Sequence, residues 1–193
     1  VEEVTERVKA YDGKLSIAVV NTPTSTVVSG DNESIDDFLE ALQSEDTFAR
    51  KVNVDYASHS AHVDTILAEL EEVLEGIKPT ATKVSFYSTV TGGKLEGQSL
   101  DAAYWGRNLR EPVRLDRALS ELLEDGLGVF IEVSAHPLLG MPLTTACSDS
   151  GGVVTGTLQR DEGSLAQLYR TLSALHTQGC PVNWEDILGK DKG

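Results

Sequence analysis

The spacing of apolar positions along the first 55 residues alternates between helical and strand periodicity. Val4 and Val8 lie one helical turn apart, whereas the residues from Phe48 to Val54 alternate between apolar and polar side chains. A β-branched stretch follows the turn Asn21-Thr22-Pro23, which is typical of a hairpin. The pattern therefore predicts a helix, two strands, a second helix and a third strand, at residues 2–10, 15–20, 24–29, 34–44 and 48–54.

That order of elements matches a ferredoxin-like βαββαβ unit without its first strand. A sheet that lacks one strand has an unpaired edge, which natural domains usually avoid. We therefore expect the sequence to start partway through a larger protein, as a fragment or as one half of a cleaved chain.

Longer helices and separated strands are predicted after residue 60. The run at 129–133 is apolar apart from Glu132, which is typical of a buried parallel strand, and a helix ending near Cys147 should follow it. Trp184 lies in an extended tail at 181–184, and its indole is expected to pack back on the domain. Further helices are predicted at 63–74, 101–109, 113–123 and 165–175, and further strands at 83–91 and 153–158. Together these elements indicate a mixed α/β fold.

Composition and charge exclude several classes of partner. Apolar residues make up 40% of the 193 residues, which is enough for a core, and no apolar run is long enough to cross a bilayer or to act as a signal peptide. We therefore expect a cytoplasmic protein. The net charge of −15 would repel nucleic acid and anionic membranes, so we expect neither as a partner.

Two sets of residues that could bind ligands are interpreted as structural. Four arginines form a basic run that Pro112 interrupts. We expect their side chains to be partly solvated and paired with neighbours such as Glu111 and Asp116. The four are Arg107, Arg110, Arg114 and Arg117. Cys147 and Cys180 lie far apart and outside any metal-ligand spacing, so we expect no metal site and no disulfide, but buried thiols.

His59 lies at the junction between the two kinds of sequence, in the stretch Val54-Asp55-Tyr56-Ala57-Ser58-His59-Ser60. Small hydroxyl residues flank it, which leaves room for a second reactant. A loop histidine is more often an ordinary hydrogen-bonding residue than a catalyst, so the assignment depends on the rest of the chain.

Six short sequence motifs, which follow one another along the chain, supply the context for His59. They are VDYASHS (54–60), VSFYSTVTGG (84–93), YWGRNLREPVR (104–114), FIEVSAHPLL (130–139), VVTGTLQRDEG (153–163) and PVNW (181–184). Together they resemble the C-terminal part of the acyltransferase domain of a type I modular polyketide synthase. The resemblance implies the malonyl transacylase-like, α/β-hydrolase-like fold with a ferredoxin-like subdomain. It also implies three regions: a small subdomain at 1–55, part of the large α/β core at 56–150, and the last strand, helix and post-acyltransferase linker at 151–193.

The same resemblance implies a two-step transfer of an extender acyl group from coenzyme A, through an active-site serine, to the phosphopantetheine thiol of an acyl carrier protein. The family places this serine in a Gly-His-Ser-x-Gly elbow, but no Gly-x-Ser-x-Gly occurs in this sequence. We therefore expect the missing N-terminal part of the domain to carry it, and this chain alone to be inactive. The implied partners are that segment, the carrier protein, a neighbouring ketosynthase domain and acyl-CoA as substrate; no separate cofactor is expected.

Within the resemblance, His59 matches the catalytic histidine, and the main-chain carbonyl of Asn108 is expected to orient its ring. Tyr56, Ala57 and Ser58 complete a Tyr-Ala-Ser-His motif that accompanies methylmalonyl instead of malonyl extender units. His136 is interpreted as a structural cap or packing residue, and His62 and His176 as surface or lining residues on helices. The alternative is a noncatalytic structural or docking fragment of a multienzyme.

Overall fold

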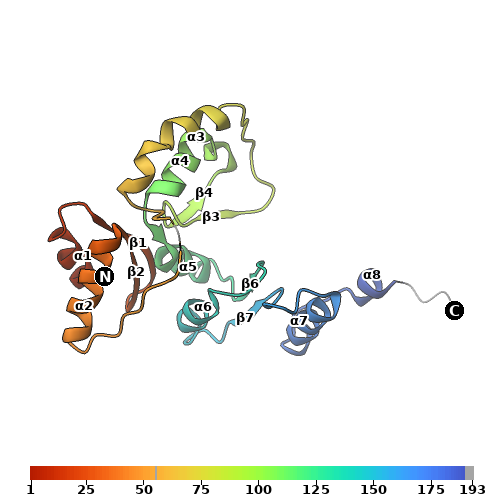
Figure 1. Ribbon diagram of the computed structural model, residues 1–193. Helices are drawn as coiled ribbons and strands as arrows, with labels where there is room; N and C mark the ends of the chain where they lie inside the picture. Colours follow the sequence, from red (N-terminus) through yellow and green to blue (C-terminus); the bar gives the residue numbers. More distant parts are fainter. Residues whose placement is uncertain (55, 190–193) are drawn as a thin grey trace. The chain divides into compact units, whose positions relative to one another are not determined.

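The computed structural model describes residues 1–54 and 56–189, so Asp55 of the His59 stretch lies outside the described residues (Figure 1). The chain forms two compact units, Val1–Leu122 and Leu123–Gly193. The region boundaries expected at 55/56 and 150/151 remain predictions.

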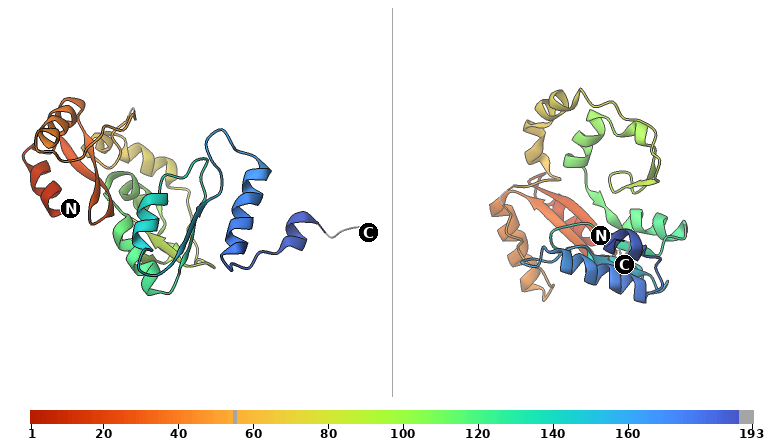
Figure 2. Two further views of the ribbon diagram at one scale, coloured as in Figure 1. Left: turned by 90° about the horizontal axis from the view of Figure 1, so that it is seen from below. Right: turned by 90° about the vertical axis from the view of Figure 1, so that its right-hand side faces the viewer.

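The first unit begins with a hairpin covered on one face by two helices (Figure 2). The elements are α1 (Glu2–Lys9), β1 (Leu15–Thr22), β2 (Ser25–Gly30) and α2 (Asn32–Ser44), as the apolar spacing predicted. Val8, Leu15 and Phe38 form the core between helices and hairpin. Gly30 ends β2 with φ +157°, and a Cβ there would lie 2.0 Å from the Lys14 carbonyl oxygen, so only glycine fits this turn into α2.

A short third strand joins this sheet from a distant part of the sequence. The strand β5 (Val113–Arg114) pairs in parallel with Val19 and Val20 of β1, giving the order β2-β1-β5. We had predicted these residues as the start of a helix, but α5 begins at Leu115 and ends at Glu124. The pairing brings the chain just after Pro112 against the hairpin, and this fixes where the functional site lies.

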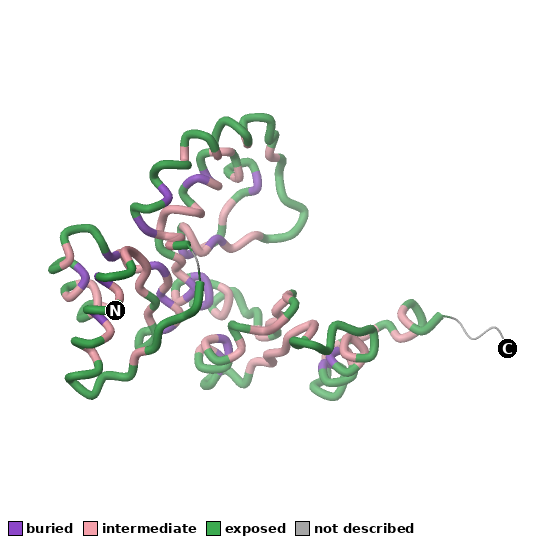
Figure 3. Tube along the Cα trace, viewed as in Figure 1, coloured by how far each residue is buried: buried purple, intermediate pink, exposed green. Residues whose placement is uncertain are grey.

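The strand predicted at 48–54 does not form. No strand spans these residues, and most of the stretch is exposed (Figure 3). Three of its apolar residues, Phe48, Val52 and Val54, are exposed, Phe48 by 89%. The prediction was wrong because alternation alone cannot make a strand: its backbone needs a neighbour to complete the hydrogen-bonded ladder, and within the described residues none pairs with this stretch.

The remainder of the first unit supports the loop that carries His59. The helix predicted at 63–74 is divided into a 3₁₀ turn and an α-helix. Tyr104 is buried, and its hydroxyl lies 2.9 Å from the Ser88 hydroxyl, which ties the β3–β4 hairpin to α4. The elements are η1 (Ala61–Thr65), α3 (Leu67–Leu74), β3 (Phe86–Ser88), β4 (Gly93–Leu95), η2 (Gly97–Ser99) and α4 (Ala102–Arg110).

The second unit contains a two-stranded parallel sheet and three helices. These are β6 (Val129–Glu132), α6 (Gly140–Ala146), β7 (Val153–Gly156), α7 (Leu165–Thr177) and α8 (Trp184–Leu188). The predicted parallel strand is present, but the prediction that it is buried was wrong: Val129 and Ile131 are exposed, because the described part of this unit, residues 123–189, leaves that face uncovered.

The C-terminal part of the second unit corrects one further prediction. The segment predicted as an extended tail becomes helical at Trp184, because the Asn183 side chain accepts a hydrogen bond from the Asp186 amide and caps α8. The indole does pack back, edge-to-face on His176 of α7 with ring centroids 5.8 Å apart. Both cysteines are free thiols: Cys147 is buried as predicted, whereas Cys180 is only partly so.

Candidate functional site

Two carbonyl oxygens from the end of α4 hold His59. Its backbone N–H donates to the Leu109 oxygen at 2.9 Å, and its ring Nδ1 lies 2.8 Å from the Glu111 oxygen. A carbonyl oxygen can only accept, so Nδ1 must carry the hydrogen in this contact. The other ring nitrogen, Nε2, is then left with a free lone pair, which is the form of imidazole that can remove a proton.

The carbonyl that contacts the ring is not the predicted one. We expected the Asn108 carbonyl in this role, but Asn108 lies inside α4, where carbonyls point along the helix axis. Glu111 is the C-cap residue and has extended backbone angles (φ −80°, ψ 156°), which turn its carbonyl away from the helix. The signal was present in the sequence, since Pro112 disfavours a helical conformation for the residue before it.

The loop around His59 is built from an unusual backbone conformation and a buried hydroxyl. His59 has φ +57°, in the left-handed region that few residues other than glycine adopt. The Ser60 hydroxyl donates to the Ala57 carbonyl at 2.7 Å and accepts from the His62 amide at 3.2 Å. These two hydrogen bonds link the chain just before His59 to the chain just after it.

An ion pair also joins this loop to α4. Nε of Arg110 lies 2.5 Å from a carboxylate oxygen of Asp64 in η1. Arg110 therefore pairs with Asp64, and not with the adjacent Glu111 that we had considered. The pair therefore joins η1, which follows His59 in the chain, to the end of α4, whose carbonyl groups contact His59.

The predicted specificity residues directly precede the histidine in the chain and differ in exposure. Tyr56 is 69% exposed, whereas Ala57 and Ser58 are half-buried. The Ser60 hydroxyl connects Ala57 to the same loop as His59. The role of these three residues in substrate choice remains a prediction.

His59 and Arg110 line an open pocket of about 530 Å³ together with Pro112 and residues of α1 and β1. Lys9 on α1 is the second basic residue there, and it is paired with Glu6 at 2.6 Å. Both cations therefore already have acidic partners. The histidine thus faces a space that can admit another molecule or another segment of protein.

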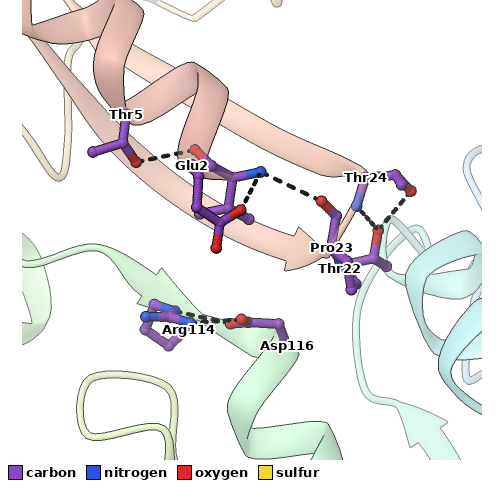
Figure 4. Close-up of polar contacts among 8 residues, drawn as sticks. Glu2, Thr5, Thr22, Pro23, Thr24, Arg114 and Asp116 are labelled. Atoms are coloured by element: carbon purple, nitrogen blue, oxygen red, sulfur yellow. Dashed lines mark hydrogen bonds and ion pairs between the residues drawn. The ribbon is translucent and has the colours of Figure 1, made fainter.

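Arg114 and Asp116 form a two-pronged ion pair at the start of α5, as the sequence predicted (Figure 4). The two Arg114–Asp116 contacts measure 2.9 and 2.6 Å. Burial alone would raise the pKa of Asp116, but hydrogen bonds from Arg114 and from the Arg117 amide outweigh burial and hold that pKa below its usual value. The Arg114 amide also donates to Thr89, so this pair anchors the residues that follow the His59 contact.

The other histidines lie in different surroundings. His136 accepts a hydrogen bond from the Arg160 amide at 3.3 Å in an exposed loop, and its structural role remains a prediction. His62 is exposed in η1, and His176 contacts Trp184. Within residues 1–54 and 56–189, no group of three or more histidine, cysteine or acidic side chains could hold a metal ion. Over the same residues, no helix is both long and apolar enough to span a bilayer.

Residues 1–182 match the family model described as the acyl transferase domain. The chain is 45% identical over 187 residues to polyketide synthase GfsB of Streptomyces halstedii, a match that covers 95% of this chain and 3% of that protein. It is 40% identical over 189 residues to erythronolide synthase EryA3 of Saccharopolyspora erythraea, covering 95% of this chain and 6% of that protein. The chain therefore spans a small fraction of these curated relatives.

Two solved structures are similar over most of this chain. The acyltransferase domain from module 8 of the salinomycin polyketide synthase has a TM-score of 0.92 and 44% identity, covering 96% of this chain and 44% of that one. A loading acyltransferase from the avermectin modular polyketide synthase has a TM-score of 0.84 and 35% identity, covering 91% of this chain and 56% of that one. These likenesses confirm the predicted α/β class of fold.

Proposed function

Since the chain belongs to the acyltransferase domain family of modular polyketide synthases, we propose that it forms the histidine-bearing part of an enzyme that transfers extender acyl groups. The acyl group would move from coenzyme A to an active-site serine and then to the phosphopantetheine thiol of an acyl carrier protein. The observation that carries this proposal is the 2.8 Å contact between His59 Nδ1 and the Glu111 carbonyl, which leaves Nε2 free to accept a proton.

In the first half-reaction, Nε2 of His59 takes the proton of the serine hydroxyl as its oxygen attacks the thioester carbonyl. The imidazolium that forms keeps its Nδ1–H directed at the Glu111 carbonyl, which stabilises the positive charge. When the tetrahedral intermediate collapses, Nε2–H gives its proton to the departing thiolate of coenzyme A. In the second half-reaction the carrier-protein thiol attacks the serine ester. Nε2 of His59 takes the proton of that thiol and then donates it to the departing serine oxygen.

The serine itself would come from a segment outside these 193 residues, because they contain no Gly-x-Ser-x-Gly sequence. The pocket at His59 is where such a segment and the acyl group could approach. The carrier protein and a neighbouring ketosynthase domain are the proposed partners, and the cytoplasm is the proposed location.

For the substrate, we propose a methylmalonyl extender. The half-buried Ser58 directly precedes His59, and a small side chain there leaves space for an α-methyl group. Discrimination by one methyl group is worth only about 1–3 kcal/mol, so malonyl-CoA would be a weaker competing substrate and not an excluded one.

The test is His59→Ala in the complete acyltransferase domain, with transfer from radiolabelled methylmalonyl-CoA to the serine and to the carrier protein as the measurement. We expect the rate to fall about 10²–10⁴-fold, as for loss of a general base, with an unchanged melting temperature. His136→Ala is the matched control and should retain the rate. Full activity of His59→Ala would instead favour the noncatalytic role, and a larger loss in His136→Ala would assign the base to the other histidine.

A further inference from the structure

Ser60 is the most deeply buried polar side chain next to the candidate base. Its residue is 1% exposed, although it lies in an irregular loop. Its hydroxyl uses both hydrogen-bonding functions: it donates to the Ala57 carbonyl at 2.7 Å and accepts from the His62 amide at 3.2 Å. The hydroxyl therefore bridges the chain across His59, from two residues before it to three residues after it.

His59 needs such support because its backbone is strained. The left-handed region is an unfavourable backbone conformation for a non-glycine residue, and it persists where the surroundings hold it. The φ of +57° at His59 belongs to that region. The bond from the His59 amide to Leu109 fixes where the residue sits, but the direction of the ring depends on the turn of the chain around it.

We propose that Ser60 is a positioning residue for His59: its hydroxyl holds the left-handed turn that directs the imidazole Nδ1–H at the Glu111 carbonyl. For catalysis the inference rests on the proposed function, because it concerns the base of that reaction. The same hydroxyl holds the Ala57 carbonyl, so it also joins the candidate specificity residues Tyr56, Ala57 and Ser58 to the base as one unit.

The geometry predicts how each substitution acts. Ser60→Ala removes the hydroxyl and leaves the Ala57 carbonyl and the His62 amide, both in part-buried contacts, without their partner. Ser60→Cys keeps a side chain of similar shape but with a weaker donor and acceptor. Ser44 offers a matched control, because its hydroxyl also donates to a main-chain carbonyl, that of Ala41, at 2.7 Å, but it is exposed on α2.

The experiment reads the protonation of the imidazole nitrogens by ¹⁵N NMR at a pH where the ring is neutral. In the unmodified chain we expect the His59 signals to report hydrogen on Nδ1. In Ser60→Ala they should shift toward those of free histidine in solution, with a smaller shift in Ser60→Cys and none in Ser44→Ala. Unchanged His59 signals in a folded Ser60→Ala chain would overturn the proposal.

Hydrogen exchange and enzyme kinetics test the proposed role of Ser60 independently of the NMR experiment. If Ser60→Ala does not fold, hydrogen exchange in the unmodified chain decides: the His62 amide should be protected, and exchange at the rate of an exposed amide would contradict the proposal. In the complete domain, Ser60→Ala should lower kcat/KM about ten- to a hundred-fold through kcat, because a small displacement of a catalytic group has an effect of that size. The NMR result does not depend on activity, so absence of transfer in every variant would refute the proposed function alone.

Discussion

Ser58 is the residue at which the methylmalonyl proposal can be tested most directly. It is half-buried beside His59, so Ser58→Phe places a large ring next to the base. If the α-methyl group lies there, the ring will clash with it or displace the acyl group from its reactive position. We expect kcat/KM in the complete domain to fall more for methylmalonyl-CoA than for malonyl-CoA. Ser99→Phe, in the exposed turn η2, is the control for the bulk of the ring; an unchanged preference in Ser58→Phe would place the methyl group elsewhere.

At the residue scale the sequence indicated His59 as a candidate, whose catalytic role stays a prediction, but it did not indicate which carbonyl contacts the ring. His59 could be recognised because it lies within a motif. The contact with the ring is made by a main-chain carbonyl, which every residue possesses, so the type of residue 111 carries no information about it and only its neighbour Pro112 does. Only the place where α4 ends distinguishes Glu111 from Asn108, and helix ends are set by local geometry that apolar spacing defines poorly.

Among the elements, β5 and the start of α5 lie just after Glu111 in the chain and are joined by the ion pair of Arg114 and Asp116. We expect Asp116→Asn to lower the free energy of unfolding by roughly 1–2 kcal/mol at pH 7, since it removes a charged hydrogen-bonded pair that is largely shielded from solvent. The folded-state pKa of Asp116 is depressed, so its contribution is complete above the unfolded-state value of about 3.9 and is lost as pH falls through the folded-state value. The difference between the two proteins should therefore shrink below about pH 4.

Urea unfolding at pH 7 and at lower pH measures this difference. The exposed pair of Lys9 and Glu6 is the matched control, and Glu6→Gln should have an effect close to zero. A constant difference between Asp116→Asn and the unmodified chain across the whole pH range would show that charge is not the cause.

The N-terminal elements, which depend on residues near them in the chain, were predicted well, whereas two predictions that depended on distant partners, at 48–54 and at β5, were wrong. Both N-terminal helices and the hairpin bury their apolar faces against one another within 44 residues, so periodicity was sufficient. The strand expected at 48–54 would have needed a partner strand, and β5 exists only because Val113 pairs with β1, far away in the sequence. Pairing between distant segments cannot be inferred from the pattern of either segment alone.

At the scale of the whole molecule, exposed apolar side chains are found in both units, among them Phe48 and Tyr56 in the first and Val133 and Met141 in the second. Apolar area that is left exposed within each unit would be stabilised by burial against another segment of protein. Together with the lack of a serine elbow, they support the proposal that catalysis needs a further segment of protein.

The last prediction follows from that proposal: the 193-residue chain should not become acylated by methylmalonyl-CoA. The buried hydroxyl next to His59, that of Ser60, already donates to the Ala57 carbonyl. Burial raises the pKa of the Cys147 thiol, which makes that thiol a poor nucleophile at neutral pH. Intact mass after incubation with methylmalonyl-CoA measures the outcome, and Cys180→Ser controls for reaction at the less buried thiol. Adding the segment that carries Gly-His-Ser-x-Gly should produce an acyl adduct on that segment, and the adduct should be lost in His59→Ala. A stable adduct on the 193-residue chain alone would mean that it has its own nucleophile and that the proposed division of the catalytic pair is wrong.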